Sequence, residues 1–254
     1  MLLAIDVGNT NIVLGCFDGR EILFRERIST APQSTALEYA SALRTALEMY
    51  HIPVAQITDA IISSVVPSVT NTLRQAVDKL FHCDALVVGP GIKTGVSIVI
   101  DDPATLGSDL VVDAVAGIHE YPLPLIIIDM GTATTLSVID EKKRYRGGVI
   151  MTGVAVSTEA LAARTAQLPR IAYEPPKSVI GTNTVDCMKS GVMYANACAL
   201  DGMVERLEEE LGSRCTVVAT GGLAGVITPL CRREMILDDD LLLKGLCLIH
   251  EKNR

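Results

Sequence analysis

The chain has 254 residues, of which 49% are hydrophobic and 20% charged, a balance that supports a folded core and excludes a disordered polymer. Its 30 acidic and 22 basic side chains give a formal net charge of −8, which disfavours binding to nucleic acids or anionic membranes, because both need a basic surface. The seven cysteines include no C-x-x-C pair, the first residues lack a basic segment, and no apolar run reaches the roughly 18 residues of a membrane span. We therefore expect a soluble cytoplasmic protein with reduced thiols.

Two segments of the chain resemble each other. Residues 3–13 (LAIDVGNTNIV) and 126–136 (IIIDMGTATTL) align at a constant offset of 123, which superimposes Asp6 on Asp129. Each copy is typical of a strand, an Asp-x-Gly turn and a second strand. Each copy is then followed by a further strand, at 21–28 and at 145–151. The repeat predicts a duplicated α/β fold with two similar domains.

The remaining elements follow from hydrophobic periodicity. The first helix has Ser34 as its expected N-cap and Leu37 on its apolar face. The apolar face of a long helix in the second half, with Met188, Met193 and Ala197, fits either core packing or a dimer surface. Helices are predicted at 34–50, 68–81, 104–119, 184–211 and 240–251, and strands at 59–65, 85–88 and 215–219.

The Tyr121-Pro122-Leu123-Pro124 segment directly precedes the second copy of the repeat. We place the domain boundary there, which predicts an N-terminal domain at 1–121 and a C-terminal domain at 122–254. A cleft between the two domains would then hold a ligand.

Both Asp-Gly turns contain residues suited to phosphate. In 6–10 (DVGNT) and 129–134 (DMGTAT), glycine lets the backbone approach a ligand closely, and N–H groups and hydroxyls can surround phosphate oxygens. Each aspartate can hold a hydrated cation that offsets phosphate charge. A single Asp-Gly pair is an ordinary hairpin turn. Two of them, together with Thr-Gly-Gly at 220–222, indicate that the chain binds a nucleoside triphosphate.

These residues resemble the actin, heat-shock ATPase and sugar-kinase superfamily, and the chain as a whole is similar to the type III pantothenate kinases. The resemblance implies duplicated actin-like (ribonuclease H-like) domains with an interdomain nucleotide cleft. The matching motifs run in family order over essentially the whole chain: DVGNTN at 6–11, SSVVP at 63–67, GIKTG at 91–95, DP at 102–103, GSD at 107–109, DMGTATT at 129–135, GGVI at 147–150, SGVMY at 190–194, ATGGL at 219–223 and LKGL at 243–246.

The resemblance implies that ATP phosphorylates the primary hydroxyl of pantothenate to give 4'-phosphopantothenate, the first step toward coenzyme A. In this comparison Asp6 lies near Mg²⁺ and the β- and γ-phosphates, and Thr132 contacts ATP from the second turn. Asp129 matches the ligand of a monovalent cation, K⁺ or NH₄⁺, and Gly221 and Gly222 match residues beside the adenosine. The first phosphate loop would comprise Asp6, Val7, Gly8, Asn9, Thr10, Asn11, Ile12 and Val13.

The resemblance also implies an acceptor site, with Asp109 as the general base. An alcohol must lose its proton during phosphoryl transfer, and a carboxylate within hydrogen-bond reach can accept it. From the sequence alone, Asp109 could instead be an acid that stabilises the first turn of a helix. Thr184 matches a pantothenate contact that the partner subunit of a homodimer supplies. The substrate residues would be Ile100, Gly107, Ser108, Asp109, Leu110 and Thr184.

The acceptor motif departs from the family pattern at two positions. Leu110 replaces an arginine, which removes a permanent charge and a forked set of donors, and Ile100 stands where an aromatic residue is usual. A milder departure is Met151-Thr152-Gly153 in place of Ala-Pro-Gly. Three hypotheses therefore remain open: a pantothenate kinase, a kinase of the same fold with another small acceptor, and a catalytically impaired regulatory relative.

Other motifs are weaker. The segment 89–94 (GPGIKT) has Ile92 where a phosphate-binding loop of the Walker type needs glycine before Lys93. The four histidines form no metal-spaced pair. The arginines at 144, 146, 232 and 233 are expected to be solvated charges rather than phosphate ligands.

Overall fold

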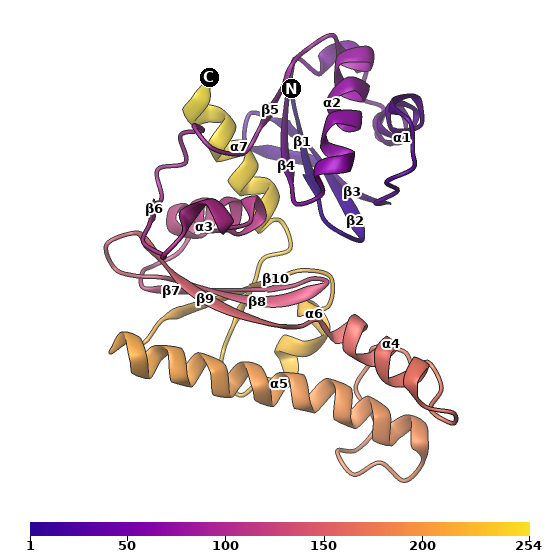
Figure 1. The fold of residues 1–254 in the computed structure, drawn as a ribbon, viewed down its shortest axis with the longest axis vertical. Helices are drawn as coiled ribbons and strands as arrows, with labels where there is room; N and C mark the ends of the chain where they lie inside the picture. Colours follow the sequence, from indigo (N-terminus) through magenta and orange to yellow (C-terminus); the bar gives the residue numbers. More distant parts are fainter. The chain divides into compact units, whose positions relative to one another are not determined.

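The computed structural model describes residues 1–254 and divides them into two compact units, which are described separately (Figure 1). Unit 1 comprises Met1–Gly95, Asp102–Ala116 and Leu241–Arg254, and unit 2 comprises Val96–Asp101 and Gly117–Asp240. Each unit is therefore discontinuous in sequence. The domain boundary expected after residue 121 remains a prediction, and the units differ from it in the C-terminal segment and around residues 96–101.

Unit 1 is built on a five-stranded sheet with the order β3-β2-β1-β4-β5. The first three strands form an antiparallel meander, whereas β4 pairs parallel to β1, and β5 parallel to β4. This is the strand, turn, strand pattern predicted for the first copy of the repeat, extended by two strands. Their bounds are β1 Leu2–Val7, β2 Asn11–Asp18, β3 Glu21–Ser29, β4 Asp59–Ser64 and β5 Ala85–Val87.

Helices cover both faces of this sheet because successive strand residues point to opposite sides. Leu3, Ile5 and Val7 of β1 belong to the core beneath α1 and α2, whereas Leu243 of α7 packs against Gly15 on the opposite face. The elements are α1 Ala36–Met49, α2 Pro67–Phe81, α7 Leu241–Asn253 and the start of α3 Ser108–Glu120, with short 3₁₀ turns at Val54–Gln56 and Pro103–Thr105.

Unit 2 repeats this topology in a six-stranded sheet with the order β11-β10-β7-β8-β9-β6. Strands β7 to β9 form the meander, and β10 pairs parallel to β7. Each meander has a register shift near the end of its second strand, at Cys16/Phe17 and at Val138/Ile139, so the predicted duplication is confirmed. The bounds are β6 Ser97–Ile98, β7 Leu125–Met130, β8 Ala133–Ile139, β9 Arg144–Thr152, β10 Thr216–Thr220 and β11 Ile236–Leu237.

The long helix α5 covers one face of the unit 2 sheet, as its path along β7 to β10 shows (Figure 1). Its Met193 and Ala197 are buried among core side chains of β7 and β10, so the reading of these two residues as a dimer surface is wrong. The helical elements are α4 Val154–Arg164, α5 Thr184–Leu211, α6 Ala224–Ile227 and a 3₁₀ turn at Thr228–Leu230. No helix of the chain is both long and apolar enough to cross a membrane.

Two local predictions need correction. The N-cap of α1 is Thr35 rather than Ser34, because Thr35 forms a reciprocal capping box with Glu38. The side chain of Leu37 is 69% exposed and does not belong to the apolar face. The helix expected at 104–119 is divided by Leu106 and Gly107, so that α3 begins at Ser108.

Candidate active site

The first Asp-Gly turn of unit 1 joins β1 to β2 and is held by three hydrogen bonds. Gly8 N–H donates to the Asn11 carbonyl at 3.0 Å, which closes the turn. Thr30 donates from its hydroxyl to the Gly8 carbonyl at 2.6 Å and from its N–H to the Thr10 carbonyl at 3.0 Å. The β3 end therefore braces the turn, and a ligand would meet a preformed loop.

Asp6 lies at the carboxyl end of β1, where it is 8% exposed and aligned with Ser63 of the parallel strand β4. Mg²⁺ prefers oxygen ligands and is commonly held by one or two carboxylates together with substrate phosphates. No group of three or more His, Cys, Asp or Glu residues could hold a metal by itself. A single carboxylate beside the Gly8 turn is compatible with that mode of binding, in which Asp6 would be the protein ligand.

Asp109 is the second residue of α3 and lies half-buried at the N-terminal end of the helix. Its Oδ1 accepts a hydrogen bond from Leu110 N–H at 2.8 Å. Burial raises the pKa of the Asp109 carboxyl, while backbone N–H groups of Leu110 and of Asp109 itself lower it in part. No charged side chain contributes to this pKa. A carboxyl with a raised pKa is a better proton acceptor than an ordinary surface aspartate.

Asp129 ends β7 in unit 2 and is flanked by hydroxyl residues on the same face of the sheet. It is aligned with Thr135 on β8 and with Thr220 on β10. The Thr135 Oγ1 is buried and has no hydrogen-bond partner. Potassium is coordinated by oxygen atoms, and ammonium donates hydrogen bonds to them. A carboxylate beside an unpartnered hydroxyl therefore fits a monovalent cation, and Asp129 and Thr135 are the residues that would hold it.

Two glycines allow other backbone segments of unit 2 to approach the second Asp-Gly turn. Gly221 has φ +96°, and a Cβ there would lie 2.6 Å from both Asp129 Oδ1 and Met130 N. A Cβ on Gly153 would collide with the carbonyl oxygens of Gly131 and Thr132. The start of α4 and the loop after β10 therefore converge on this turn, which brings Gly221 close to Asp129. Gly222 follows on the exposed side of the loop.

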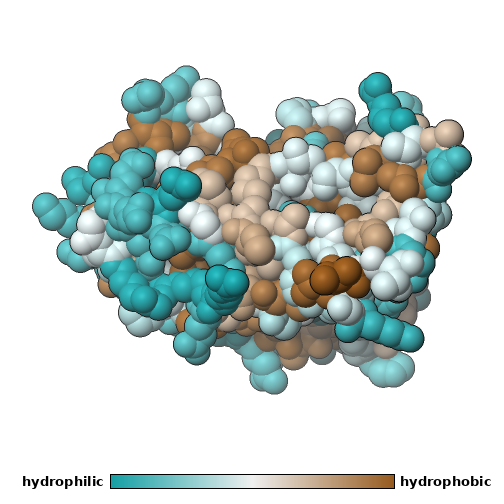
Figure 2. Space-filling view, turned by 90° about the horizontal axis from the view of Figure 1, so that it is seen from below, coloured by the Kyte–Doolittle hydropathy of each residue, from teal (hydrophilic) through white to brown (hydrophobic).

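Ile100 and Thr184 lie on other parts of unit 2. The segment of Ile100 runs beside β9, where Val99 N–H donates to the Tyr145 carbonyl at 3.0 Å. Thr184 begins α5, after the N-cap Asn183, and lines a hollow of about 490 Å³ between α4 and α5. Figure 2 shows the molecule from the side of α5, with hydrophilic residues gathered at the left and hydrophobic residues mixed with weakly polar ones over the middle and right. The hollow is lined mainly by apolar side chains, among them Leu161, Leu168, Met188 and Val192.

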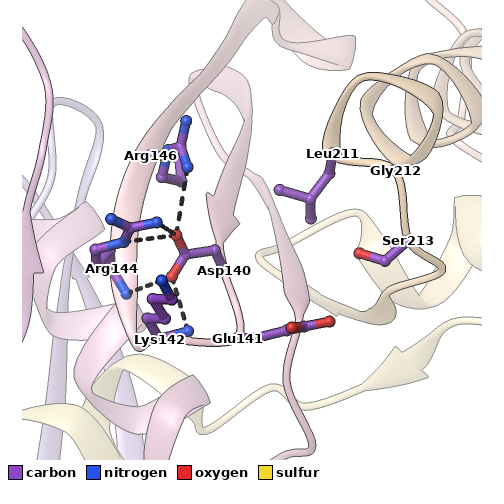
Figure 3. Close-up of a pocket in the computed structure, with 8 residues that line it drawn as sticks. All are labelled: Asp140, Glu141, Lys142, Arg144, Arg146, Leu211, Gly212 and Ser213. Atoms are coloured by element: carbon purple, nitrogen blue, oxygen red, sulfur yellow. Dashed lines mark hydrogen bonds and ion pairs between the residues drawn. The ribbon is translucent and has the colours of Figure 1, made fainter.

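A second hollow, of about 250 Å³, lies between the β8–β9 turn and the end of α5 (Figure 3). Asp140 is 6% exposed and accepts hydrogen bonds from Arg144 Nε at 2.8 Å and from Arg146 Nη1 at 3.4 Å. Arg144 and Arg146 pair with this buried acid while their side chains stay 37% and 47% exposed, so both remain solvated charges as expected. Arg233 departs from that expectation, because it bonds Glu208 at 2.7 Å with its side chain 15% exposed.

Comparison with known proteins decides the family. A family model described as type III pantothenate kinase matches residues 2–206. The chain belongs to the type III pantothenate kinase family. A curated type III pantothenate kinase from a species of Exiguobacterium is 46% identical over 254 residues, which covers 100% of both chains.

Solved structures support the fold. A protein from Campylobacter jejuni named for the Baf family of transcriptional activators superimposes with a TM-score of 0.61 at 15% identity, covering 99% of this chain and 98% of that one. A ROK hexokinase from Thermus thermophilus gives a TM-score of 0.50 at 13% identity, covering 98% and 97%. These likenesses concern architecture alone. They agree with the duplicated actin-like fold expected of the pantothenate kinase family.

The sequence did not single out every residue at these sites. Ser63 and Ser64 occur in the SSVVP match, but nothing in their local pattern gave them a role. In unit 1 they lie against Ser108, with Ser63 Oγ 3.1 Å from Ser108 Oγ. Thr135 likewise closes a motif match, and only the strand register places it opposite Asp129. Pairing across strands and between distant segments is information that a local pattern lacks.

Proposed function

We propose that this chain uses ATP to phosphorylate the primary hydroxyl of pantothenate, with Asp109 as the general base. The observation that carries the proposal is the Asp109 carboxyl itself, which is half-buried at the start of α3, where burial raises its pKa. A base of this kind can accept the hydroxyl proton as the oxygen attacks the γ-phosphate, so that a poor nucleophile becomes competent. Membership of the family supports the reaction type and the acceptor.

Residues of the two Asp-Gly turns would bind the nucleotide. In unit 1 the turn from Asp6 to Val13 would surround phosphate oxygens with backbone N–H groups, and in unit 2 Thr132 would contact ATP while Gly221 and Gly222 lie by the adenosine. Mg²⁺, when bound, offsets the charge of the phosphates. Asp6 would hold that ion, and Asp129 would hold K⁺ or NH₄⁺. The proposal rests on the braced turn of unit 1 and on the oxygen atoms around Asp129.

The acceptor end of the site favours a second candidate substrate class. Leu110 supplies no cation, and no charged side chain influences the pKa of Asp109. The carboxylate of pantothenate, at the opposite end of the molecule from the primary hydroxyl, would then lack the charged donors that an arginine in place of Leu110 would supply, which is unfavourable. A neutral amide derivative of pantothenate carries the same primary hydroxyl without that charge. This second candidate keeps ATP, Asp109 and the reaction, and changes only the acceptor. Gly107 and Ile100 would line the acceptor site in either case.

We also propose that the chain acts as a cytoplasmic homodimer in which Thr184 reaches the acceptor of the partner subunit. All seven cysteines are free thiols, as a reducing compartment would keep them. Ile180 is 81% exposed and Val179 60% exposed, close to Thr184 in the chain. Large exposed apolar side chains in one segment are typical of an interaction surface. Sedimentation of the purified protein as a monomer would contradict this part of the proposal.

The experiment that tests the function is a product assay with purified protein, ATP, Mg²⁺ and K⁺. Pantothenate and a neutral amide, such as pantetheine, are supplied in separate reactions, and the phosphorylated product is identified by mass. We expect product in at least one reaction and none with Asp109→Asn. Product from pantothenate supports the first candidate, and product from the amide alone supports the second. Measurable ATP binding without any product would contradict both and favour the regulatory hypothesis.

A further inference from the structure

The Ser108 hydroxyl is fully occupied by hydrogen bonds within unit 1. It donates to the Ser64 carbonyl at 3.1 Å, accepts from Ser64 N–H at 3.2 Å, and lies 3.1 Å from the Ser63 Oγ. A hydroxyl has one proton to donate and two lone pairs to accept with. Because its proton is given to a carbonyl, the contact with Ser63 must be one that Ser108 accepts. All three positions are then used, and none remains for an acceptor molecule.

These bonds join two elements that are far apart in the sequence, α3 and β4. Ser108 is the first residue of α3, and Ser63 and Ser64 end β4. The network continues into the start of α2, because Thr70 Oγ1 donates to Ser64 Oγ at 2.7 Å and Val66 N–H donates to the same oxygen at 3.1 Å. Ser63 is fully buried. A partly buried network in which each of these hydroxyls is hydrogen-bonded favours one arrangement of its elements.

The network lies between two residues of the proposed reaction. Ser63 is aligned with Asp6 on the neighbouring parallel strand. At the other end, Ser108 directly precedes Asp109, whose own carboxylate is held by the adjacent Leu110 N–H. That last bond is local to the first turn of α3, so it moves with the helix. The Ser108 hydroxyl is the group that hydrogen-bonds the start of the helix to β4.

We propose that Ser108, held by Ser63 and Ser64, is a positioning residue that sets where the Asp109 carboxylate stands relative to the end of β1, and that it is not a contact to the acceptor. This inference rests on the proposed function, since it gives Asp109 the role of base. A catalytic group displaced by about 1 Å can lose on the order of 100-fold in rate. Loss of the hydroxyl therefore lowers kcat and leaves the binding of ATP unchanged.

The test compares Ser108→Ala and Ser63→Ala with Ser108→Thr, which keeps a hydroxyl at the same position. Thr45→Ala is the matched control, because it removes a hydroxyl that bonds only within α1, to the Ser41 carbonyl at 2.9 Å. We expect Ser108→Ala to lower kcat by 10- to 100-fold, as an order of magnitude, with KM for ATP within threefold. Ser108→Thr should restore most of kcat, and Thr45→Ala should match the wild type.

Two results would overturn the inference. If Ser108→Ala raises the KM for the acceptor and leaves kcat unchanged, Ser108 is a substrate contact. If Ser108→Ala has kcat and KM within twofold of wild type, Ser108 has no role in positioning Asp109. Absence of turnover in the wild type would instead count against the proposed function. The positioning role can then be tested by a measurement that does not depend on activity, which is the titration of the Asp109 carboxyl by ¹³C NMR. The signal is assigned by its absence in Asp109→Asn. Ser108→Ala should shift its pKa, because the start of α3 is released, and an identical pKa in the two proteins would refute the positioning role.

Discussion

Gly107 leaves no room for a side chain beside the Asp109 carboxylate. An ideal Cβ on Gly107 would collide with Asp109 Oδ1, whereas the nearest atom outside that residue, Val65 Cγ1, would be at an ordinary 3.8 Å. Gly107→Ala therefore conflicts with the carboxylate alone. The oxygen must retreat by roughly 1 Å, and misplacement of that size costs up to about 100-fold in rate.

The expected loss corresponds to about 2.7 kcal/mol of transition-state stabilisation, at about 1.36 kcal/mol for each tenfold. Stability should change by less than about 1 kcal/mol, because no backbone atom obstructs the new methyl group and alanine restricts the unfolded chain. Steady-state kinetics and thermal unfolding measure the two effects. Gly89→Ala is the control, since an added Cβ at Gly89 meets nothing within 4 Å. A Gly107→Ala enzyme with kcat within twofold of wild type would refute the placement of the carboxylate.

Three further perturbations test other parts of the structure. Gly212→Ala should lower the free energy of unfolding by about 1–2 kcal/mol, because the backbone at Gly212 is left-handed. Gly221→Ala should cost about 1–3 kcal/mol more, since its Cβ would also lie 2.6 Å from a backbone nitrogen. Equal losses of stability for the two variants in urea unfolding would disprove that steric overlap at Gly221. Burial alone would raise the pKa of Asp140, but hydrogen bonds from Arg144 and Lys142 outweigh it and hold the pKa at about 2, below its usual 3.8. This carboxyl thus contributes stability that is complete above about pH 4 and lost as the pH falls toward 2, and unfolding of Asp140→Asn should lack that part of the pH dependence. Leu110→Arg should lower the KM for pantothenate by about tenfold or more, because the arginine can form a charged hydrogen bond with the substrate carboxylate. The KM for a neutral amide should not change. Equal changes in KM for both acceptors would argue against the idea that the site lacks a cation.

Local pattern was sufficient for the parts of the fold that repeat. The constant offset between Asp6 and Asp129 predicted both meanders, because an Asp-Gly turn between two apolar strands is defined by adjacent residues. The helix expected at 184–211 has the same bounds in the structure, Thr184–Leu211, since a sustained apolar stripe is a local signal. The order of the strands around each meander could not be predicted from the sequence, because it depends on parallel pairing between distant segments.

Where prediction failed, tertiary contacts decided the outcome. The helix Val154–Arg164 was missed because it buries few of its residues, among them Val154 and Thr158, and so has no apolar stripe. Met193 could not be assigned from its helical spacing, since a core face and a dimer face look alike until the sheet beneath is known. The motif predicted Ser108 to be a substrate residue, but its bonds to Ser64 connect positions 44 residues apart and could not be seen in the local pattern.

The central claim is that Asp109 accepts a proton during phosphoryl transfer from ATP to a small alcohol. The most direct test is a single-turnover reaction with enzyme in excess over γ-labelled ATP, run with wild type and Asp109→Asn while ATP binding is measured on the same samples. Equal ATP affinity, with transfer of label to the acceptor at least about 100-fold slower in Asp109→Asn, is the predicted result. Transfer at the same rate in both proteins would contradict the assignment of Asp109 as the base.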